Sequence, residues 1–407
     1  MLDLSERLSP AVHAVLDQRL APTSAAPLTV ALSGGGDSLA LLILTLDWAG
    51  RHGRGVHALV FDHALHPDSA AWTSFALDAA RRLGAQADSL RWDGPKPASG
   101  LPAAARAARH AALAERARQL GASVLLMGHT ADDRLEAAAM RAEGGSVSEP
   151  REWAPSPAWP QGRGLFVLRP LLDVRRAALR EFLRARGETW LEDPANDNQR
   201  FARARVRRAL GADQAPPPRV AAAAPSIAGW REAFGALVAE GSVDPDSIAP
   251  AILSAGGGMR PPDRRRLDRL KARIAASGDF SATLANARLQ RRGAVLTVTR
   301  EPGRDGILGA SMAPGAVQVW DGRFEIRSAR PAQLRSLGGL AARLPAAQRA
   351  ALARVPAAAR GALPALVDAD GAVVCPILAG RQEDAVAVSL VMARFAAACG
   401  QTTTEAN

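Results

Sequence analysis

Three glycines, two serines and an aspartate separate two apolar runs near the start of the chain, in the segment Ser33–Ser38 (SGGGDS). Glycine lets the backbone turn sharply and brings amide N–H groups close to an anion at a helix N-terminus. Phosphate is the usual ligand of such a loop. Because Asp37 would repel phosphate unless a divalent cation lay between them, the segment predicts a nucleotide phosphate bound together with Mg²⁺.

Two phosphate-binding motifs fit this segment less well. A Walker loop requires a lysine after its glycines, and the nearest lysine is Lys96. A dinucleotide fingerprint would have Gly34 and Gly36, but Leu39 stands where its third small residue belongs. Asp62 could still act as its ribose-binding acid, so this interpretation stays open.

Two interpretations without phosphate also remain. A nucleophile elbow, as in an α/β hydrolase that would use Ser33, has glycine where this chain has Ala31. A tight strand-to-helix turn with no ligand is the simplest alternative, although such turns seldom need three glycines and an acid.

Two further polar segments follow apolar runs in the same way, at 62–69 (DHALHPDS) and 128–136 (GHTADDRLE). The carboxyl ends of the strands in an open α/β sheet form one ligand crevice. We therefore expect the three segments to converge on one site. Its candidate residues are Ser33, Gly34, Gly35, Gly36, Asp37, Ser38, Asp62, His63, His129, Asp133 and Glu136.

The residues of the second and third segments allow other roles. Asp133 and Glu136 lie one turn apart on one helix face, where acids near a helix N-terminus also stabilise the helix dipole. His129, Asp133 and Asp62 could be metal ligands of a metallohydrolase, but no HExxH or HxH spacing supports that set.

The first half of the chain alternates strand-like and helix-like segments, which predicts an α/β fold with a parallel sheet covered by helices on both faces. Strands are expected at 28–32, 56–62, 87–92 and 123–127. Helices are expected at 38–48, 68–83, 100–120, 129–141 and 173–186, the last with its N-cap at Asp173 and its end at Gly187.

The segment 142–164 has no hydrophobic period and is expected to be a long surface loop. A stretch rich in proline and alanine at 212–225 predicts a linker between domains. The expected organisation is a catalytic domain at 1–211, the linker, a helical region at 226–276 and a small α+β region at 277–407.

The net charge of +11 comes almost entirely from arginine and favours a polyanionic partner. Two cysteines, Cys375 and Cys399, are too few for a disulfide framework, and no segment has the roughly 18 apolar residues of a membrane span. The first twenty residues lack the apolar core of a signal peptide. We therefore expect a cytoplasmic protein.

The SGGGDS loop after a first strand resembles the SGGxDS loop of the PP-loop ATP pyrophosphatase superfamily, whose fold is adenine nucleotide alpha hydrolase-like. These enzymes cut ATP between the α and β phosphates and adenylate an oxygen of their substrate. Further segments resemble the tRNA(Ile)-lysidine synthase family over roughly residues 26–210. They are FDHALHPDS, GLPAAARAARHAAL, GHTADDRLEAAAMR, LRPLLDVRRAAL and WLEDPANDNQRFARARVR.

The chain departs from that family's pattern at three places. His66 replaces an arginine, Ala137 replaces a threonine, and AEGGSVSEP after Met140 replaces an arginine- and glycine-rich stretch. The absence of cysteine from the first domain agrees with this family rather than with thiolating relatives. Neither Cys375 nor Cys399 has the context of a glutaminase nucleophile.

The resemblance implies a ligase that attaches free lysine to C2 of the wobble cytidine, position 34, of tRNA(Ile) with a CAU anticodon. ATP and Mg²⁺ would adenylate the cytidine, and lysidine, AMP and pyrophosphate would result. Asp37 would hold the metal and His129 the nucleotide. Arg109, Asp133 and Glu136 would bind or deprotonate lysine.

Two arginine-rich runs are candidates for contact with RNA. The run 200–208 (RFARARVRR) directly follows the expected catalytic domain, and its Arg203, Arg205 and Arg207 are the candidate RNA-binding residues. The second run, 260–273, is equally well explained as the solvated face of a helix.

Overall fold

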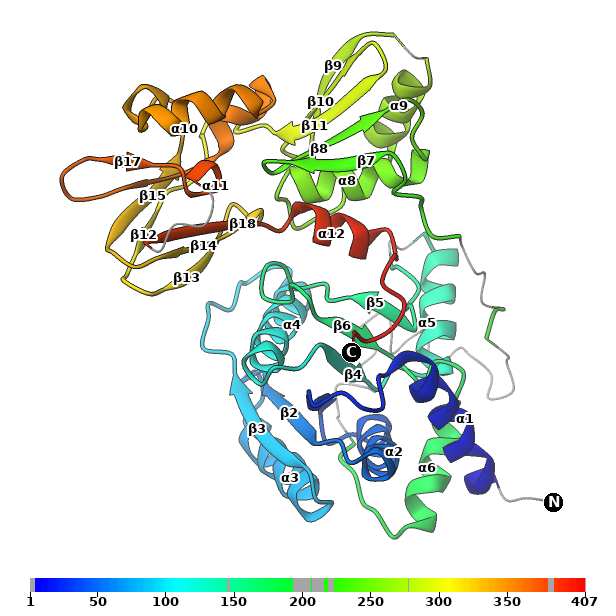
Figure 1. Cartoon of the computed structure of the whole chain (residues 1–407). Coiled ribbons are helices and arrows are strands. Elements are labelled where there is room, and N and C mark those ends of the chain that lie inside the picture. Colours follow the sequence, from blue (N-terminus) through cyan, green and yellow to red (C-terminus); the bar gives the residue numbers. More distant parts are fainter. Residues whose placement is uncertain are drawn as a thin grey trace. The chain divides into compact units, whose positions relative to one another are not determined.

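The computed structural model describes residues 4–144, 147–192, 206, 216–218, 223–276, 278–379 and 384–406 (Figure 1). The chain divides into two compact units, Met1–Ala222 with Thr402–Asn407, and Ala223–Gln401. Arg203, Arg205, Arg207 and most of the expected linker lie outside the described residues. No helix among the described residues is long and apolar enough to span a membrane.

The first unit is built on a six-stranded sheet in the order β3-β2-β1-β4-β6-β5. All neighbouring strands are parallel except β5, which is antiparallel to β6. The parallel sheet expected from the sequence is therefore confirmed. The strands are β1 Leu28–Leu32, β2 Val56–Asp62, β3 Gln86–Arg91, β4 Val124–Met127, β5 Trp153–Pro155 and β6 Phe166–Leu168.

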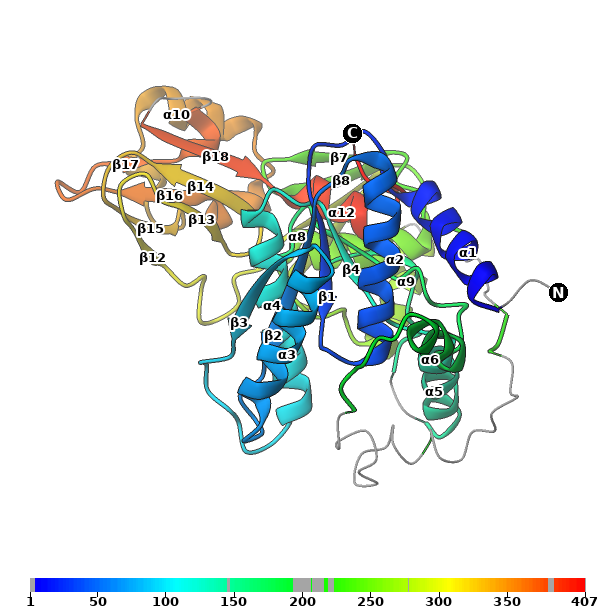
Figure 2. The same ribbon diagram turned by 90° about the horizontal axis from the view of Figure 1, so that it is seen from below.

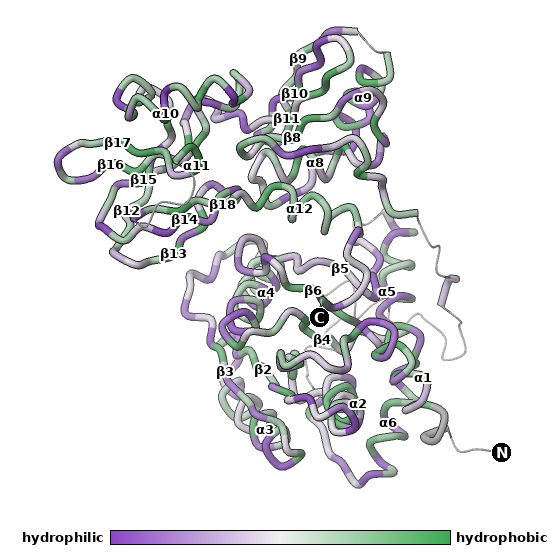
Figure 3. The backbone as a smooth tube through the Cα atoms, in the orientation of Figure 1, coloured by the Kyte–Doolittle hydropathy of each residue, from purple (hydrophilic) through white to green (hydrophobic). Residues whose placement is uncertain are grey.

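Helices cover both faces of this sheet (Figure 2). One core contains alternate strand residues such as Val30 and Leu126 packed against α1, α2, α3 and α6, and the opposite core packs Leu125 and Met127 against α4. The amphipathic helices α3 and α4 alternate polar and apolar residues along the chain (Figure 3). The helices are α1 Leu4–Arg19, α2 Gly36–His52, α3 Ser69–Arg82, α4 Leu101–Gln119, α5 Ala131–Ala142 and α6 Arg176–Ala185.

Two details of the first unit differ from the expectation. The segment 142–164 is not wholly a loop, because it contains the edge strand β5, which pairs with β6. Helix α6 begins at Arg176 rather than after an N-cap at Asp173. Its first N–H donates instead to the Asp132 carboxylate at 2.7 Å, and Asp173 accepts a hydrogen bond from Arg134. A side chain of α5 therefore satisfies the start of α6.

The second unit contains three antiparallel sheets, of five, four and three strands. Helices α8 and α9 lie in the stretch 226–276 that was expected to be helical, but β7 and β8 occupy its beginning. The strands of this unit are β7 Trp230–Ala233, β8 Ala236–Glu240, β9 Phe280–Leu284, β10 Ala287–Arg292, β11 Val295–Arg300, β12 Ala310–Met312, β13 Val317–Trp320, β14 Phe324–Ser328, β15 Ala332–Ser336, β16 Pro364–Val367, β17 Val373–Val374 and β18 Ala385–Ser389.

Two hydrophobic cores hold this second unit together. One packs α8 and α12 against the five-stranded sheet, through residues such as Ile252, Leu296 and Phe395. The other joins the two smaller sheets through Phe324 and Leu334. Its α-helices are α8 Ile248–Ala255, α9 Arg264–Ala275, α10 Ala346–Ala351, α11 Pro376–Ala379 and α12 Val391–Ala398, and its 3₁₀ turns are η2 Pro245–Ser247, η3 Ala341–Arg343, η4 Leu352–Arg354 and η5 Ala357–Ala362.

The last residues of the chain belong to the first unit, where Glu405 forms a buried ion pair with Arg54. Both Arg54 Nη atoms donate to Glu405, at 2.6 and 2.9 Å, and the two side chains are 1% and 0% exposed. Ser123 Oγ and the Ala21 N–H donate to the same carboxylate. A residue at the end of the chain is thus anchored beside the amino ends of β1, β2 and β4.

Candidate functional site

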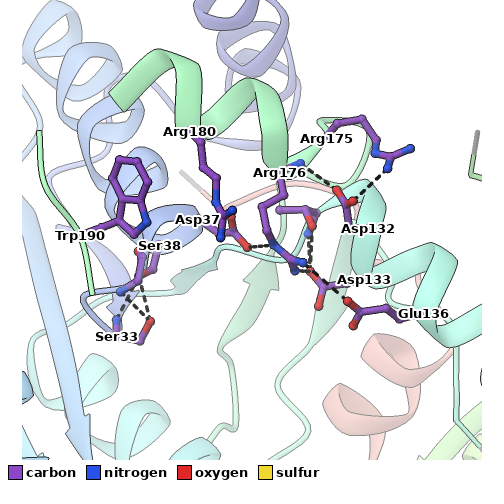
Figure 4. Close-up of polar contacts among 12 residues, drawn as sticks. Ser33, Asp37, Ser38, Asp132, Asp133, Glu136, Arg175, Arg176, Arg180 and Trp190 are labelled. Carbon is purple, nitrogen blue, oxygen red and sulfur yellow. Dashed lines mark hydrogen bonds and ion pairs between the residues drawn. The ribbon is translucent and has the colours of Figure 1, made fainter. Parts of the chain in front are cut away.

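The glycine loop connects the end of β1 to the start of α2 and is closed by its two serines. Ser38 Oγ donates to the Gly35 carbonyl at 2.9 Å and accepts from the Ser33 N–H at 3.2 Å. The two hydroxyl oxygens lie 3.0 Å apart (Figure 4). These contacts hold the loop in a compact turn at the N-terminus of α2, the position at which backbone amides bind anions.

Glycine is required at two positions around this turn. Gly34 has a φ of +81°, and a Cβ there would lie 2.8 Å from the side chain of Leu191. The segment after α6 packs against the loop, because the Leu191 N–H donates to the Gly34 carbonyl at 2.9 Å. Gly128, at the end of β4, allows a close approach to the backbone of Asp37 and Ser38, where a Cβ would come within 3.1 Å.

Asp37 lies in the first turn of α2 and pairs with Arg176, the first residue of α6. Arg176 Nε donates to Asp37 Oδ2 at 2.9 Å (Figure 4). Burial raises the pKa of Asp37 above its ordinary value, and the guanidinium opposes that rise. The charge of Asp37 therefore depends on a nearby cation.

The acids of α5 face the same arginine. Arg176 Nη2 lies 3.8 Å from Asp133 Oδ2, and its Nη1 lies 3.6 Å from Glu136 Oε1. Three acids that the sequence predicted for the site, Asp37, Asp133 and Glu136, thus lie around Arg176, which the sequence did not predict. Burial alone would lower the pKa of Arg176, but the three carboxylates outweigh it and raise the pKa above its ordinary value. The side chain therefore stays charged.

Asp133 and Glu136 differ in their surroundings. Asp133 also caps α5, since its Oδ2 accepts hydrogen bonds from the Thr130 N–H at 2.8 Å and from Thr130 Oγ1 at 3.0 Å. The helix-stabilising role left open by the sequence is therefore present for Asp133. Glu136 has a side chain only 1% exposed. Burial of a carboxylate so deep in the structure is costly without a cation nearby.

His129 lies in a strongly basic surrounding between β4 and α5. Arg169, which follows β6, lies with its Nε 3.2 Å from His129 Nδ1. Burial lowers the pKa of His129 to about 3, against the attraction of Asp133, and Arg169, Arg106 and Arg109 add to the fall. His129 is therefore neutral at physiological pH and can donate or accept a hydrogen bond without carrying charge.

Arg109, on α4, lowers the pKa of His129 and also that of the neighbouring buried His110. The pKa of His110 falls to about 3, mainly because of burial, and Arg109 adds to the fall. The pKa of Arg169 is lowered to about 10 by burial and by Arg106 and Arg109. Arg109 thus belongs to a basic cluster around His129.

Asp62 and His63 lie at the end of β2, with other partners. Asp62 is buried and accepts a hydrogen bond from the Ala64 N–H at 2.7 Å, and Arg91 lies 3.8 Å away. The His63 ring meets Phe61 edge-on. These contacts shape the turn after β2.

Two arginines of the site were not singled out from the sequence. Arg169 and Arg176 stand in the segment LRPLLDVRRAAL, which carried only a resemblance and no assigned role. Only their positions in the sequence could have indicated a role, because Arg169 directly follows a strand and Arg176 begins the next helix. In a chain with 51 lysines and arginines, however, the residue type alone does not distinguish them.

The donor set fits a magnesium ion bound through phosphate rather than a protein cage. Within the described ranges, no group of three or more His, Cys, Asp or Glu side chains could hold a metal. Mg²⁺ in nucleotide sites uses one or two carboxylates and takes its other ligands from phosphates and water. Asp37, in the first turn of the helix that follows the glycine loop, is the carboxylate that would hold such an ion.

The fold and the loop define a class of protein. The family model for a PP-loop domain matches residues 8–213, which include the whole sheet and the glycine loop. The strand order, the serine-closed glycine turn and its aspartate are therefore those of a PP-loop protein that uses ATP.

Curated relatives narrow the class. The chain is 48% identical to the tRNA(Ile)-lysidine synthase of Caulobacter vibrioides over 404 residues, which cover 96% of this chain and 97% of that protein. It is 39% identical to that of Hyphomonas neptunium, over 65% of this chain and 79% of the relative. The enzyme of Rhizobium meliloti is 33% identical, over 75% of this chain and 74% of the relative. The chain belongs to the tRNA(Ile)-lysidine synthase family.

Proposed function

We propose that this chain is a cytoplasmic, Mg²⁺-dependent ligase that joins free lysine to C2 of cytidine 34 in tRNA(Ile) with a CAU anticodon. The observation that carries the proposal is one cluster at the carboxyl edge of the sheet. In it, Asp37 of the glycine loop and Glu136 of α5 share the Arg176 guanidinium. The cluster combines a nucleotide loop with a buried acid suited to an amine, in a chain of this family.

The proposed reaction has two steps, and each step releases a leaving group. The C2 oxygen of the cytidine attacks the α-phosphorus of ATP, forming a P–O bond and releasing pyrophosphate. The ε-amine of lysine then attacks C2, and the C–O bond breaks to release AMP. The amine must lose a proton as the C–N bond forms, and the carboxylates of Asp133 and Glu136 are the proposed acceptors.

The roles of the other residues follow from their places around the loop. The backbone from Ser33 to Ser38 would bind the phosphates of ATP, and a magnesium ion held by Asp37 would neutralise their charge. Asp62 and His63 would line the nucleotide at the end of β2. Neutral His129 would contact it by a hydrogen bond, and Arg109 would attract the carboxylate of lysine.

A hydrolase that uses Ser33 is not favoured. The Ser33 hydroxyl lies against the Ser38 hydroxyl and 3.4 Å from the Gly35 N–H, within the turn itself. A serine nucleophile needs a histidine base within hydrogen-bond reach. These contacts suit a hydroxyl that supports a phosphate loop.

Measurement of AMP and pyrophosphate, the products of ATP cleavage, tests the proposed function. The purified chain is incubated with ATP and Mg²⁺, with tRNA(Ile) and lysine added together or singly, and AMP and pyrophosphate are measured. We expect sustained formation of AMP only with both substrates. AMP formation that does not depend on tRNA would contradict the proposal.

Replacing Glu136 with glutamine is expected to impair capture of lysine. The change keeps the shape of the side chain and removes the charge that would attract the lysine ammonium, and losing a buried partner of a charge costs about 2–5 kcal/mol. The kcat/KM for lysine should therefore fall at least about thirtyfold, while tRNA-dependent release of pyrophosphate survives in part. Steady-state kinetics at varied lysine concentration measure this.

The matched control is Glu143→Gln, an exposed acid at the end of the same helix. If Glu136 serves only the helix dipole, its variant should lose less than about 1 kcal/mol of stability and keep its lysine KM. An unchanged KM would remove Glu136 from the substrate site.

Replacing Arg203, Arg205 and Arg207 together is expected to weaken tRNA binding. Each lost phosphate contact should lower the slope of log K against log salt by somewhat less than one, because fewer counterions are released on binding. Filter binding of tRNA(Ile) at several salt concentrations measures the slope. If the slope is unchanged, this run is a solvated surface and the RNA contacts lie elsewhere.

A further inference from the structure

One planar cation faces three carboxylates of the site. The three guanidinium nitrogens of Arg176 each approach a different acid: Nε lies 2.9 Å from Asp37, Nη1 lies 3.6 Å from Glu136, and Nη2 lies 3.8 Å from Asp133 (Figure 4). No two of these distances use the same nitrogen. The arrangement therefore depends on the forked shape of the guanidinium as well as on its charge.

The three acids come from two separate parts of the chain. Asp37 lies in the first turn of α2 after β1, whereas Asp133 and Glu136 lie on α5 after β4. Arg176 begins α6, and its own N–H donates to Asp132 of α5 at 2.7 Å. Both ends of Arg176 are thus tied to the site, so the side chain has little freedom to leave it.

Arg176 compensates the negative charge that these acids bring to one place. Glu136 is almost completely buried, and Asp133 and Asp132 both raise the pKa of Asp37 by repulsion, in addition to burial. Arg176 is the cation that lowers the pKa of Asp37. Without it, mutual repulsion would move the carboxylates apart.

We propose that Arg176 is a positioning residue that couples the two halves of the site, by holding Asp37 toward the nucleotide and Glu136 toward the amine substrate. This inference rests on the proposed function. Arg176 acts through these two carboxylates. The binding of both ligands would therefore depend on Arg176 without direct contact between Arg176 and either ligand.

Lysine cannot replace arginine in this role. Its ammonium is a single point charge, whereas the guanidinium offers donors in fixed directions from one plane. Arg176→Lys keeps the charge of the cluster and removes the fork, so at most one or two of the three contacts can persist. The substitution therefore separates the geometry of Arg176 from its charge.

The test measures binding rather than turnover. Calorimetry gives the Kd of Mg²⁺ with a non-hydrolysable ATP analogue, and separately the Kd of free lysine, for the wild-type chain and for Arg176→Lys. We expect the variant to weaken both ligands about tenfold or more, as the loss of a charge-assisted hydrogen bond does. The control is Arg82→Lys, because the forked contact of Arg82 with Glu188 involves none of the acids of the site, and both its Kd values should stay within twofold of wild type.

A second readout separates positioning from simple loss of stability. Arg176→Ala should regain part of its affinity for both ligands when guanidinium ion is added at millimolar concentration, and ethylammonium should not restore it. If Arg176→Lys melts below the assay temperature, both Kd values are measured on Arg176→Gln, which is also expected to weaken both ligands.

The outcomes distinguish this inference from the proposed function. If wild type binds both ligands and the variants weaken neither or only one, the coupling role of Arg176 is wrong and the proposed function stands. If wild type binds the nucleotide but never lysine, both are wrong. Equal rescue by guanidinium and by ethylammonium would show that Arg176 supplies charge alone.

Discussion

Asp37→Ala is expected to abolish formation of AMP while the fold remains intact. Asp37 is the carboxylate at the mouth of the glycine loop, and its loss removes the protein ligand that would join the metal to the phosphates. Metal-ion stabilisation of a developing charge is worth several kcal/mol. The rate of tRNA-dependent AMP release should therefore fall about 10²–10⁴-fold.

The control for this variant is Asp47→Ala, which removes an exposed acid from the same helix, α2. Its turnover should equal that of wild type. Circular dichroism of both variants should show a normal fold, because Asp37 faces other polar groups at the helix start and contributes little packing. Normal turnover by the Asp37 variant would contradict the assignment of the loop to metal and phosphate.

Glu405→Gln is expected to cause a large loss of stability far from the candidate site. It leaves the buried Arg54 guanidinium without its charged partner, and breaking a buried pair by removing one member costs about 3–5 kcal/mol. Urea denaturation of the full chain, followed by a signal from the first unit, should show this loss in the free energy of unfolding.

The matched control is Asp78→Asn, which breaks an exposed pair with Arg81 in the same unit. Exposed pairs contribute about 0–1 kcal/mol, so the control should be close to wild type. Equal effects of the two substitutions would mean that the Glu405 anchor contributes no more than a surface contact.

Much of the first unit could be predicted from the sequence because its signals are local. The alternating apolar residues of β1 and the glycines that follow it indicate a strand, a turn and a helix without knowledge of the rest of the chain. The order of such segments then predicts a parallel sheet and a shared edge. The structure places Asp37 and Glu136 around one guanidinium at that edge.

The features that were not predicted depend on long-range contacts. Arg176 is one arginine among many until the fold brings it to Asp37, a residue 139 positions earlier. Asp132 replaces the expected cap of α6 from another helix. Glu405 stands near the end of the chain with no neighbouring motif, and its importance arises only from Arg54, 351 positions away. Periodicity carries no information about such pairs.

Mass spectrometry of the tRNA shows directly whether this chain forms lysidine at position 34. Purified tRNA(Ile) with a CAU anticodon is incubated with the chain, ATP, Mg²⁺ and isotopically labelled lysine, and is then digested to nucleosides. We expect one modified cytidine from position 34 that contains the label from lysine, and no product when ATP or lysine is omitted. Unmodified cytidine at position 34 after full incubation, or label at another position, would contradict the proposed function.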